Sequence, residues 1–201
     1  MALTDKLTAI ADVLRNYTGK TDLLTLEDMA DEMELILNAI TGNKQKFTYK
    51  YYNANNIEVF PKLDLTSATD ISRMHYGCTK MKALPDYDTR NVTTFTRMCD
   101  TCREMVRARF NLSKATNVTA FLVGCTALVE LRFDGTININ LPLDECPSLD
   151  SASVDSIAAA IVDLTGQTAK TVTFHSNVVI TQSQRARFTS KNWNISGGKE
   201  A

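Results

Sequence analysis

The chain has 201 residues, a formal net charge of −1 and 44% hydrophobic residues. Its basic and acidic side chains nearly balance, whereas nucleic acids and anionic membranes attract a concentrated excess of Lys and Arg. No run approaches the roughly 20 apolar residues of a membrane span, and the N-terminus lacks the pattern of a secretory signal. We therefore expect a protein made and retained in a cytosol, with no nucleic acid and no membrane insertion among its interactions.

Residues 1–41 are predicted to form two amphipathic helices. Apolar residues recur at helical spacing in both, Gly19 can end the first helix, and Thr25 can cap the second. Two helices of this size make too small a core to be stable alone, so we expect an anchoring module that forms a homo-oligomer or inserts into a partner. The side chains assigned to that contact are Leu7, Ile10, Leu14, Met29, Met33 and Leu37.

Residues 42–56 are assigned to a linker and a capping hairpin. Polar residues follow Gly42, and the alternation in 47–51 and 57–60 around an Asn-rich turn predicts two paired strands. Such a hairpin would cover the exposed strand edges and apolar core at the start of a stacked array.

Cysteine marks a repeated pattern in residues 57–150. Alignment on four cysteines places an apolar residue seven positions before each, with Cys-to-Cys intervals of 21, 26 and 21 residues. A period of about 20 to 30 residues indicates stacked units with one shared core. The longer second interval predicts a bulge or loop around 107–116. We assign Cys78, Cys99, Cys125 and Cys146 to the repeat core as reduced thiols.

The pattern changes after Cys146. Ser151–Ser153 opens a predicted helix that ends near Gly166, and a strand is expected at 170–174, a helix at 181–190 and a short strand at 193–195. We assign 151–196 to a C-terminal α/β cap and 197–201 to a loose tail.

The repeat region resembles the leucine-rich repeats of the BspA type, which occur in bacterial surface proteins and in phages of gut bacteria. The resemblance rests on Asn117-Val118-Thr119-x-Phe121, Gly124-Cys125-x-x-Leu128 and the related residues around Asn91 and Gly77. Pro142 and Cys102 depart from the pattern. The resemblance implies an α+β fold: a short leucine-rich-repeat (BspA-like) solenoid with an N-terminal helical pair and a C-terminal α/β cap. The segment 3–30 is similar to an N-terminal module of phage and prophage structural proteins, which implies a place in a virion.

Catalytic and cofactor motifs are weak. Thr18-Gly19-Lys20-Thr21 lacks the earlier glycine and the preceding strand of a phosphate-binding loop. Cys99 and Cys102 have the spacing of half a zinc site or of a redox pair, but two further ligands are missing. His75 and His175 have no nucleophile or acid beside them in a recognisable pattern. We expect no enzyme activity and no cofactor.

Six basic residues follow the repeat cysteines and could form a stripe along one face. One interpretation is a solvated face balanced by Glu104, Glu130 and Asp134, and the other is a docking surface for an acidic partner or an anionic glycan. The residues of this candidate face are Lys80, Lys82, Arg103, Arg107, Arg109 and Arg132.

The sequence thus favours a non-enzymatic virion protein, assembled in the host cytoplasm, whose helices anchor it to the particle. Its partners would be other virion proteins and a host-surface protein or glycan. A bacterial cell-surface adhesin with the same repeats, and an intracellular thiol or metal protein that uses Cys99 and Cys102, are the alternatives.

Overall fold

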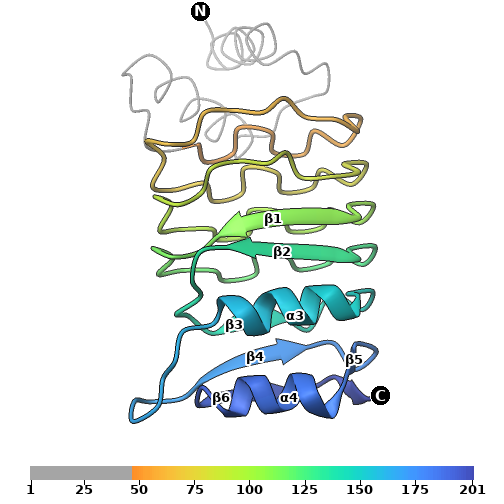
Figure 1. Ribbon diagram of the computed structural model, residues 1–201. Coiled ribbons are helices and arrows are strands. Elements are labelled where there is room, and N and C mark those ends of the chain that lie inside the picture. Colours follow the sequence, from red (N-terminus) through yellow and green to blue (C-terminus); the bar gives the residue numbers. More distant parts are fainter. Residues whose placement is uncertain (1–46) are drawn as a thin grey trace, which may run out of the picture. The chain divides into compact units, whose positions relative to one another are not determined.

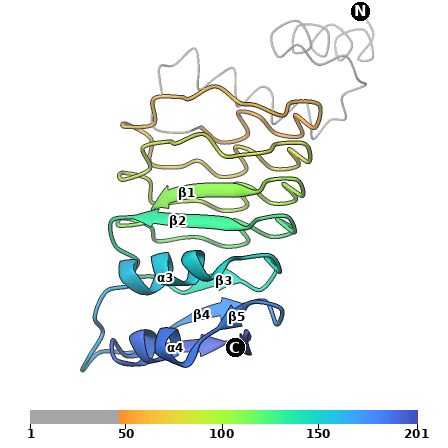
Figure 2. The same cartoon turned by 45° about the vertical axis from the view of Figure 1, so that its right-hand side comes forward.

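The computed structural model describes residues 47–201, which form a stack of parallel turns of chain (Figure 1). The chain divides into two compact units, Met1–Lys44 and Gln45–Ala201, and the described residues belong to the second. Within it, all strand pairs and isolated bridges run parallel. Each turn therefore follows the direction of the turn before it, as the rotated view in Figure 2 also shows.

A repeated set of main-chain hydrogen bonds joins the first turns on one side of the stack. Alternate N–H groups of one turn donate to alternate carbonyl groups of the next. In the second turn the donors are Ile71, Arg73, His75 and Gly77, and the acceptors are Thr94, Thr96, Met98 and Asp100, at 2.8–3.0 Å. The same bonds start from residues 47, 49, 51 and 53 one turn earlier and from 95, 97, 99 and 101 one turn later.

Left-handed residues recur in the same register. One column consists of Tyr49, Arg73, Arg97 and Ala120, with φ between 52° and 60°. A second consists of Asn53, Gly77, Thr101 and Gly124, with φ between 54° and 71°. Glycine is needed at position 77 in particular, because a Cβ atom there would lie 2.0 Å from Asn53 Oδ1. The backbone repeat is thus already present at residue 47, the first described residue, which is earlier than the sequence pattern indicated.

The cysteine register expected from the sequence is wrong at one position. Cys78, Cys102 and Cys125 are equivalent, because each thiol donates to a carbonyl of the turn before it, at 3.0 Å. Cys146 makes the corresponding bond at 3.5 Å. Cys99 instead lies in the next inward-facing column, together with Tyr51, His75 and Leu122. Its thiol is buried, so it belongs to the core, but it is Cys102 that occupies the repeat position.

This register removes the long interval that predicted a bulge. Counted on Cys102, the intervals are 24, 23 and 21 residues. Residues 107–111 form the regular strand β1 (Arg107–Asn111), which pairs in parallel with β2 (Glu130–Asp134). The expected loop around 107–116 is therefore confined to the residues after β1.

The hairpin predicted within residues 47–60 is also absent. Phe47, Tyr49 and Tyr51 donate to carbonyl groups of the turn at 70–76, at distances of 2.8–3.1 Å, rather than to residues 57–60. Phe47 and Tyr51 pack against the core, whereas Tyr49 takes the left-handed position that Arg73 has in the next turn. The alternating aromatic residues therefore do not mark a strand. This segment is a first turn of the stack and not a separate cap.

In the C-terminal part, helices replace the extended segments on the side of β1 and β2. Helix α3 (Ser151–Ala160) packs next to β2, and α4 (Gln182–Thr189) follows it (Figure 1). The opposite side carries the parallel sheet β3-β4-β6, made of β3 (Leu141–Leu143), β4 (Lys170–Phe174) and β6 (Trp193–Ser196). The helices and strands expected after residue 150 are thus present.

Local chemistry explains where these helices begin and end. The Asp150 side chain accepts from Ser153 N and caps α3, while Thr181 and Gln184 form a capping box at α4. Helix α3 ends earlier than expected because Ile161 turns to an extended conformation and forms a bridge with Ile137.

The predicted loose tail is partly ordered. Gly197 and Gly198 have φ of 71° and 67°, which lets the chain pass close to Phe174 and Ile180. The strand β7 (Lys199–Glu200) then pairs with β5 (Val179–Ile180).

The core is one continuous column of apolar side chains. Phe110 contacts Phe95 and Phe121 at centroid distances of 6.1 and 5.6 Å, so aromatic rings from successive turns interlock. Full burial of a side chain of this size contributes about 1.5–3 kcal/mol. Each turn therefore depends on the next one for most of its stabilisation.

Candidate functional site

An arginine-lined cleft lies on the outer face of β1 and β2. In β1, Ala108 and Phe110 point into the core, so that Arg107 and Arg109 project to solvent. The parallel register sets Arg107 beside Glu130, and Arg109 beside Arg132. The resulting cleft has a volume of about 330 Å³ and is lined by Leu84, Asp86, Arg107, Ala108, Arg109, Glu130 and Arg132.

The three arginines of this arginine cleft are held differently. Arg109 pairs with Asp134 at 3.0 Å. Arg132 lies 3.7 Å from Glu130 and 3.5 Å from Asp150, and it also donates to Ser153 Oγ at 3.0 Å. Arg107 forms no ion pair with any residue from 47 to 201. Arg132 is thus fixed in place, whereas the guanidinium group of Arg107 is free to bind an anionic group.

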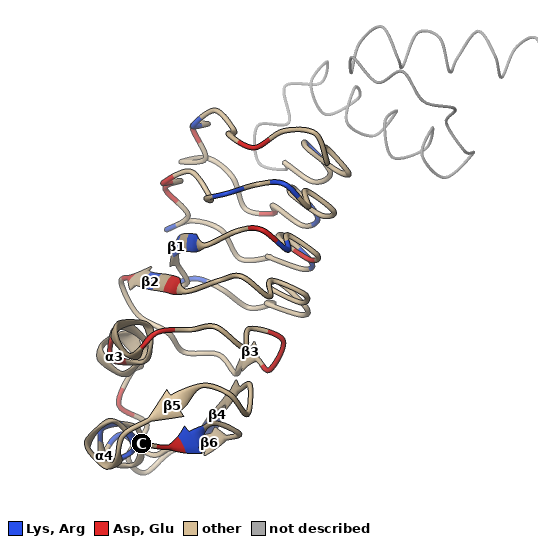
Figure 3. Ribbon diagram, turned by 90° about the vertical axis from the view of Figure 1, so that its right-hand side faces the viewer, with Lys and Arg blue, Asp and Glu red and all other residues tan. Residues whose placement is uncertain are grey.

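The other three predicted basic residues do not reach the cleft. Lys80, Lys82 and Arg103 are exposed, but they precede the strands and are not among the residues that line it. Lys82 pairs with Glu104, whose hydrogen bond raises the pKa of the lysine, and the pKa of Glu104 is lowered in return. Figure 3 shows the basic and acidic segments interspersed along this part of the stack. Three of the six basic residues therefore line the cleft, and the other three lie on a surface of mixed charge.

Asp86 is the member of the cleft that the sequence pattern missed. It lies in the turn that bridges to β1 through Ala83 and Arg107, and it has no repeat cysteine or basic neighbour to mark it. Only the pairing of these two turns brings its carboxylate to the arginines.

The five cysteines are free thiols buried in the core. Burial raises the pKa of the Cys146 thiol to about 12, and it also raises the pKa values of Cys78, Cys99 and Cys125. A thiol in this protonated form is a poor nucleophile and a poor metal ligand. Within residues 47–201, no group of three or more His, Cys, Asp or Glu side chains is placed to hold a metal ion.

His75 is a neutral core residue. Its ring lies among Tyr51, Phe60 and Tyr87, at centroid distances of 5.1, 4.7 and 5.8 Å. The Nε2 atom shares a hydrogen bond of 3.1 Å with the Tyr87 hydroxyl, and Nδ1 has no partner in the described part of the chain. Burial lowers the pKa of His75 to about 3, so near neutral pH the ring is uncharged and carries a proton on only one of its two nitrogens. His175 lies at the end of β4, where its Nδ1 accepts from Asn177 N at 3.1 Å.

The predicted oligomerisation residues Leu7, Ile10, Leu14, Met29, Met33 and Leu37 lie outside the described residues, as does the Thr18–Thr21 motif. In the described portion, no helix has the length and apolar character that crossing a membrane requires.

Three comparisons with known proteins found no relative of this chain. No family model, no curated protein and no solved structure matches the chain.

Proposed function

We propose that this chain is a non-enzymatic structural or attachment protein of a phage particle. In this proposal residues 1–41 anchor the protein to the particle as a homo-oligomer, and the repeat region faces a neighbouring virion protein or a host-surface protein or glycan. Support for the virion comes from the sequence resemblance of the segment 3–30 to phage structural modules. Support for a binding role comes from the described residues.

The observation that carries the binding role is the arginine cleft. A guanidinium group offers a planar fork of donors that matches carboxylate, sulfate and phosphate groups. Arg107 is exposed and forms no ion pair with the described residues, while Arg109 and Arg132 beside it are already oriented by acidic partners. A site in which one cation is available and its neighbours are fixed suits an anionic group on a protein or glycan.

Two alternatives are less well supported. A bacterial cell-surface adhesin would use the same cleft and differ only in location. An intracellular thiol or metal protein would need reactive cysteines, but the side chains of Cys99 and Cys102 are fully buried, and Cys102 Sγ is engaged by the His75 carbonyl.

The virion role is tested by mass spectrometry of purified particles. We expect the chain at a constant copy number per particle that survives washing in high salt. Absence from washed particles would overturn the virion role but not the binding role.

The binding role is tested by adsorption of the purified full chain to host cells and to immobilised heparin, a sulfated glycan. Arg107→Glu should weaken binding at least about tenfold, since it replaces attraction by repulsion at the free cation. The control is Lys50→Glu, which makes the same change of charge at an exposed position of the first turn. Equal binding by both variants and the wild type would contradict a role for the cleft.

A further inference from the structure

The main-chain ladder that joins the first turns is interrupted after the turn that begins at residue 118. By register, the donors of this turn that correspond to Ile71, Arg73, His75 and Gly77 are Val118, Ala120, Leu122 and Gly124. In three earlier turns these N–H groups bind carbonyl groups of the next turn, but here none of the four has an acceptor within residues 47–201. Main-chain N–H groups are rarely left unpaired, so these donors take their acceptors from solvent or from a bound molecule.

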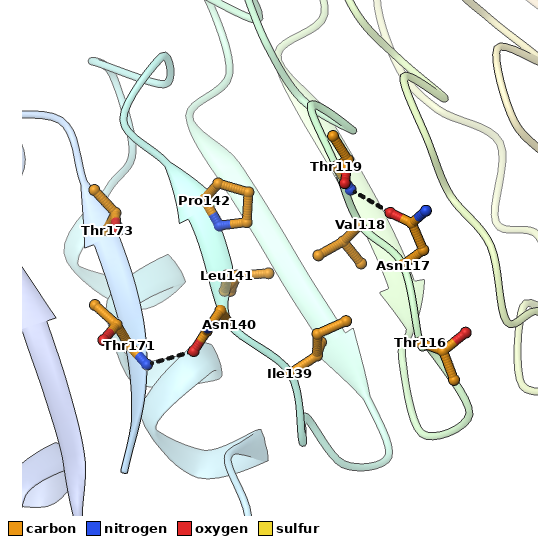
Figure 4. A pocket seen from close by; sticks show the side chains of 10 residues that line it. All are labelled: Thr116, Asn117, Val118, Thr119, Ile139, Asn140, Leu141, Pro142, Thr171 and Thr173. Carbon is orange, nitrogen blue, oxygen red and sulfur yellow. Dashed lines mark hydrogen bonds between the residues drawn. The ribbon is translucent and has the colours of Figure 1, made fainter. Parts of the chain in front are cut away.

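A groove of about 360 Å³ lies at the interruption (Figure 4). Residues 116–119 form one wall and 139–142 the other, and Thr171 and Thr173 extend the second wall. That second wall is β3, the outer strand of the sheet β3-β4-β6, so one edge of β3 has no strand partner in the described region. The groove closes toward Cys146, whose thiol reaches the Leu122 carbonyl. Its open part is therefore next to Val118, and Ala120 follows just beyond the first wall.

The cause of the groove is the change of element on the other side of the stack. Helix α3 packs beside β2 where an extended segment would otherwise continue. A packed helix lies about 10 Å from its neighbour, whereas paired strands lie about 4.8 Å apart. The turn that carries β3 therefore cannot stay at strand spacing from the turn at 118–124 along its whole length. The turn at 118–124 is also bent by Ala120 and Gly124, both left-handed, whereas β3 is straight.

The groove presents main-chain groups together with the side-chain amides of Asn117 and Asn140 and the hydroxyl groups of four threonines. Asn117 Oδ1 accepts from Thr119 N, and Asn140 Oδ1 accepts from Thr171 N, both at 2.9 Å. The lining contains no charged residue and no aromatic ring. Pro142 has no N–H group, so it disfavours the pairing of β3 with a strand of another sheet. The carbonyl group of Pro142 remains as an acceptor.

We propose that this groove, between residues 116–119 and 139–142, binds an uncharged peptide segment of a partner protein that follows the bent path of the neighbouring turns. The molecule itself shows what these donors bind, because their equivalents at 71, 73, 95 and 97 all bind alternate carbonyl groups of the next turn, which runs parallel and bends at left-handed residues. The positive ends of the free N–H dipoles and the negative carbonyl groups of a peptide are complementary in charge. A glycan fits less well, since the groove has no aromatic ring on which a sugar could stack. The proposal does not depend on a virion location.

The test is amide hydrogen exchange by NMR on the full chain, with and without a synthetic peptide. The probe is the acetylated and amidated peptide of residues 117–121, whose own carbonyl groups accept from residues 95, 97 and 99 in the stack. Without peptide, the amides of Val118 and Ala120 should exchange faster than those of Phe95 and Arg97. With peptide at about 5 mM, their exchange should slow at least about tenfold, as weak main-chain pairing predicts.

Variants separate the groove from the rest of the surface. Thr119→Trp or Thr116→Trp, at exposed positions of the first wall, should abolish the protection, and Thr126→Trp, at an exposed position outside the groove, should preserve it. Three results would overturn the proposal: protection of Val118 and Ala120 before peptide is added, no slowing with peptide, or a response to maltoheptaose in its place. None of these results bears on whether the protein is found in purified particles.

Discussion

Mild acid should destabilise the stack through a single buried histidine. The side chain of His75 is fully buried, and its pKa is lowered to about 3 by desolvation. In the unfolded chain a histidine has its ordinary pKa of about 6.5. Below that pH the unfolded state gains a proton that the folded state does not take up, so the free energy of unfolding falls as the pH falls from 6.5 toward 3. One unit of pH is worth about 1.4 kcal/mol, which gives a loss of about 2 kcal/mol at pH 5.

The assay is urea unfolding of the full chain between pH 7.5 and pH 5, for the wild type and for His75→Leu. Leucine is a suitable replacement because Leu122 occupies the same inward-facing column. The variant lacks the ring contacts of His75 at every pH, so this difference does not depend on pH. Between pH 7.5 and pH 5 the free energy of unfolding should fall by about 2 kcal/mol more in the wild type than in the variant. His175 and all carboxylates are common to both proteins and cancel in the comparison. Equal pH dependence in the two proteins would refute the claim that His75 stays neutral in the folded state.

Three further predictions concern the stack. Native protein should leave all five thiols unreactive toward a thiol reagent at pH 8, and denaturant should expose all five, because all are buried away from the reagent and burial also raises the pKa values of Cys78, Cys99, Cys125 and Cys146. Rapid labelling of Cys99 or Cys102 would contradict this. Asp150→Ala should lower the free energy of unfolding by about 1–2 kcal/mol through loss of the α3 cap, whereas Asp163→Ala, in an exposed turn, should change it by less than about 0.5 kcal/mol. Gly77→Ala should lower the free energy of unfolding by at least about 2 kcal/mol, because the added Cβ atom meets Asn53. Thr101→Gly, in the same left-handed column, should lower it by no more than about 0.5 kcal/mol. Thermal or urea unfolding measures the Asp150/Asp163 pair and the Gly77/Thr101 pair.

The C-terminal elements could be predicted because their signals are local. A capping residue, helical spacing and β-branched runs lie within the segments that form α3, β4, α4 and β6. The register of the turns could not be fixed in the same way. Cys99 and Cys102 are three residues apart and both buried, so the apolar pattern fits either of them. What identifies Cys102 as the repeat position is the His75 carbonyl group that its thiol reaches, together with the left-handed residue that precedes Cys78, Cys102 and Cys125. The sequence shows that residue as glycine only twice.

The candidate sites show the same limit. Spacing after the repeat cysteines selected six basic residues, and pairing of the turns brought only Arg107, Arg109 and Arg132 together. The groove beside Val118 left no trace in the sequence pattern, because it arises from main-chain bonds that are not made. The lining residues are neither charged nor aromatic, so their composition does not mark them as a binding site.

The central claim is that residues 47–196 form parallel turns in which Cys78, Cys102, Cys125 and Cys146 occupy one column. A crystal structure of the full chain, at a resolution that defines main-chain carbonyl groups, tests it most directly. The account predicts each of these four sulfur atoms 3.0–3.5 Å from a carbonyl oxygen of the turn before it, namely those of Tyr51, His75, Cys99 and Leu122. Electron density that places Cys99 Sγ, and not Cys102 Sγ, in this column would contradict it.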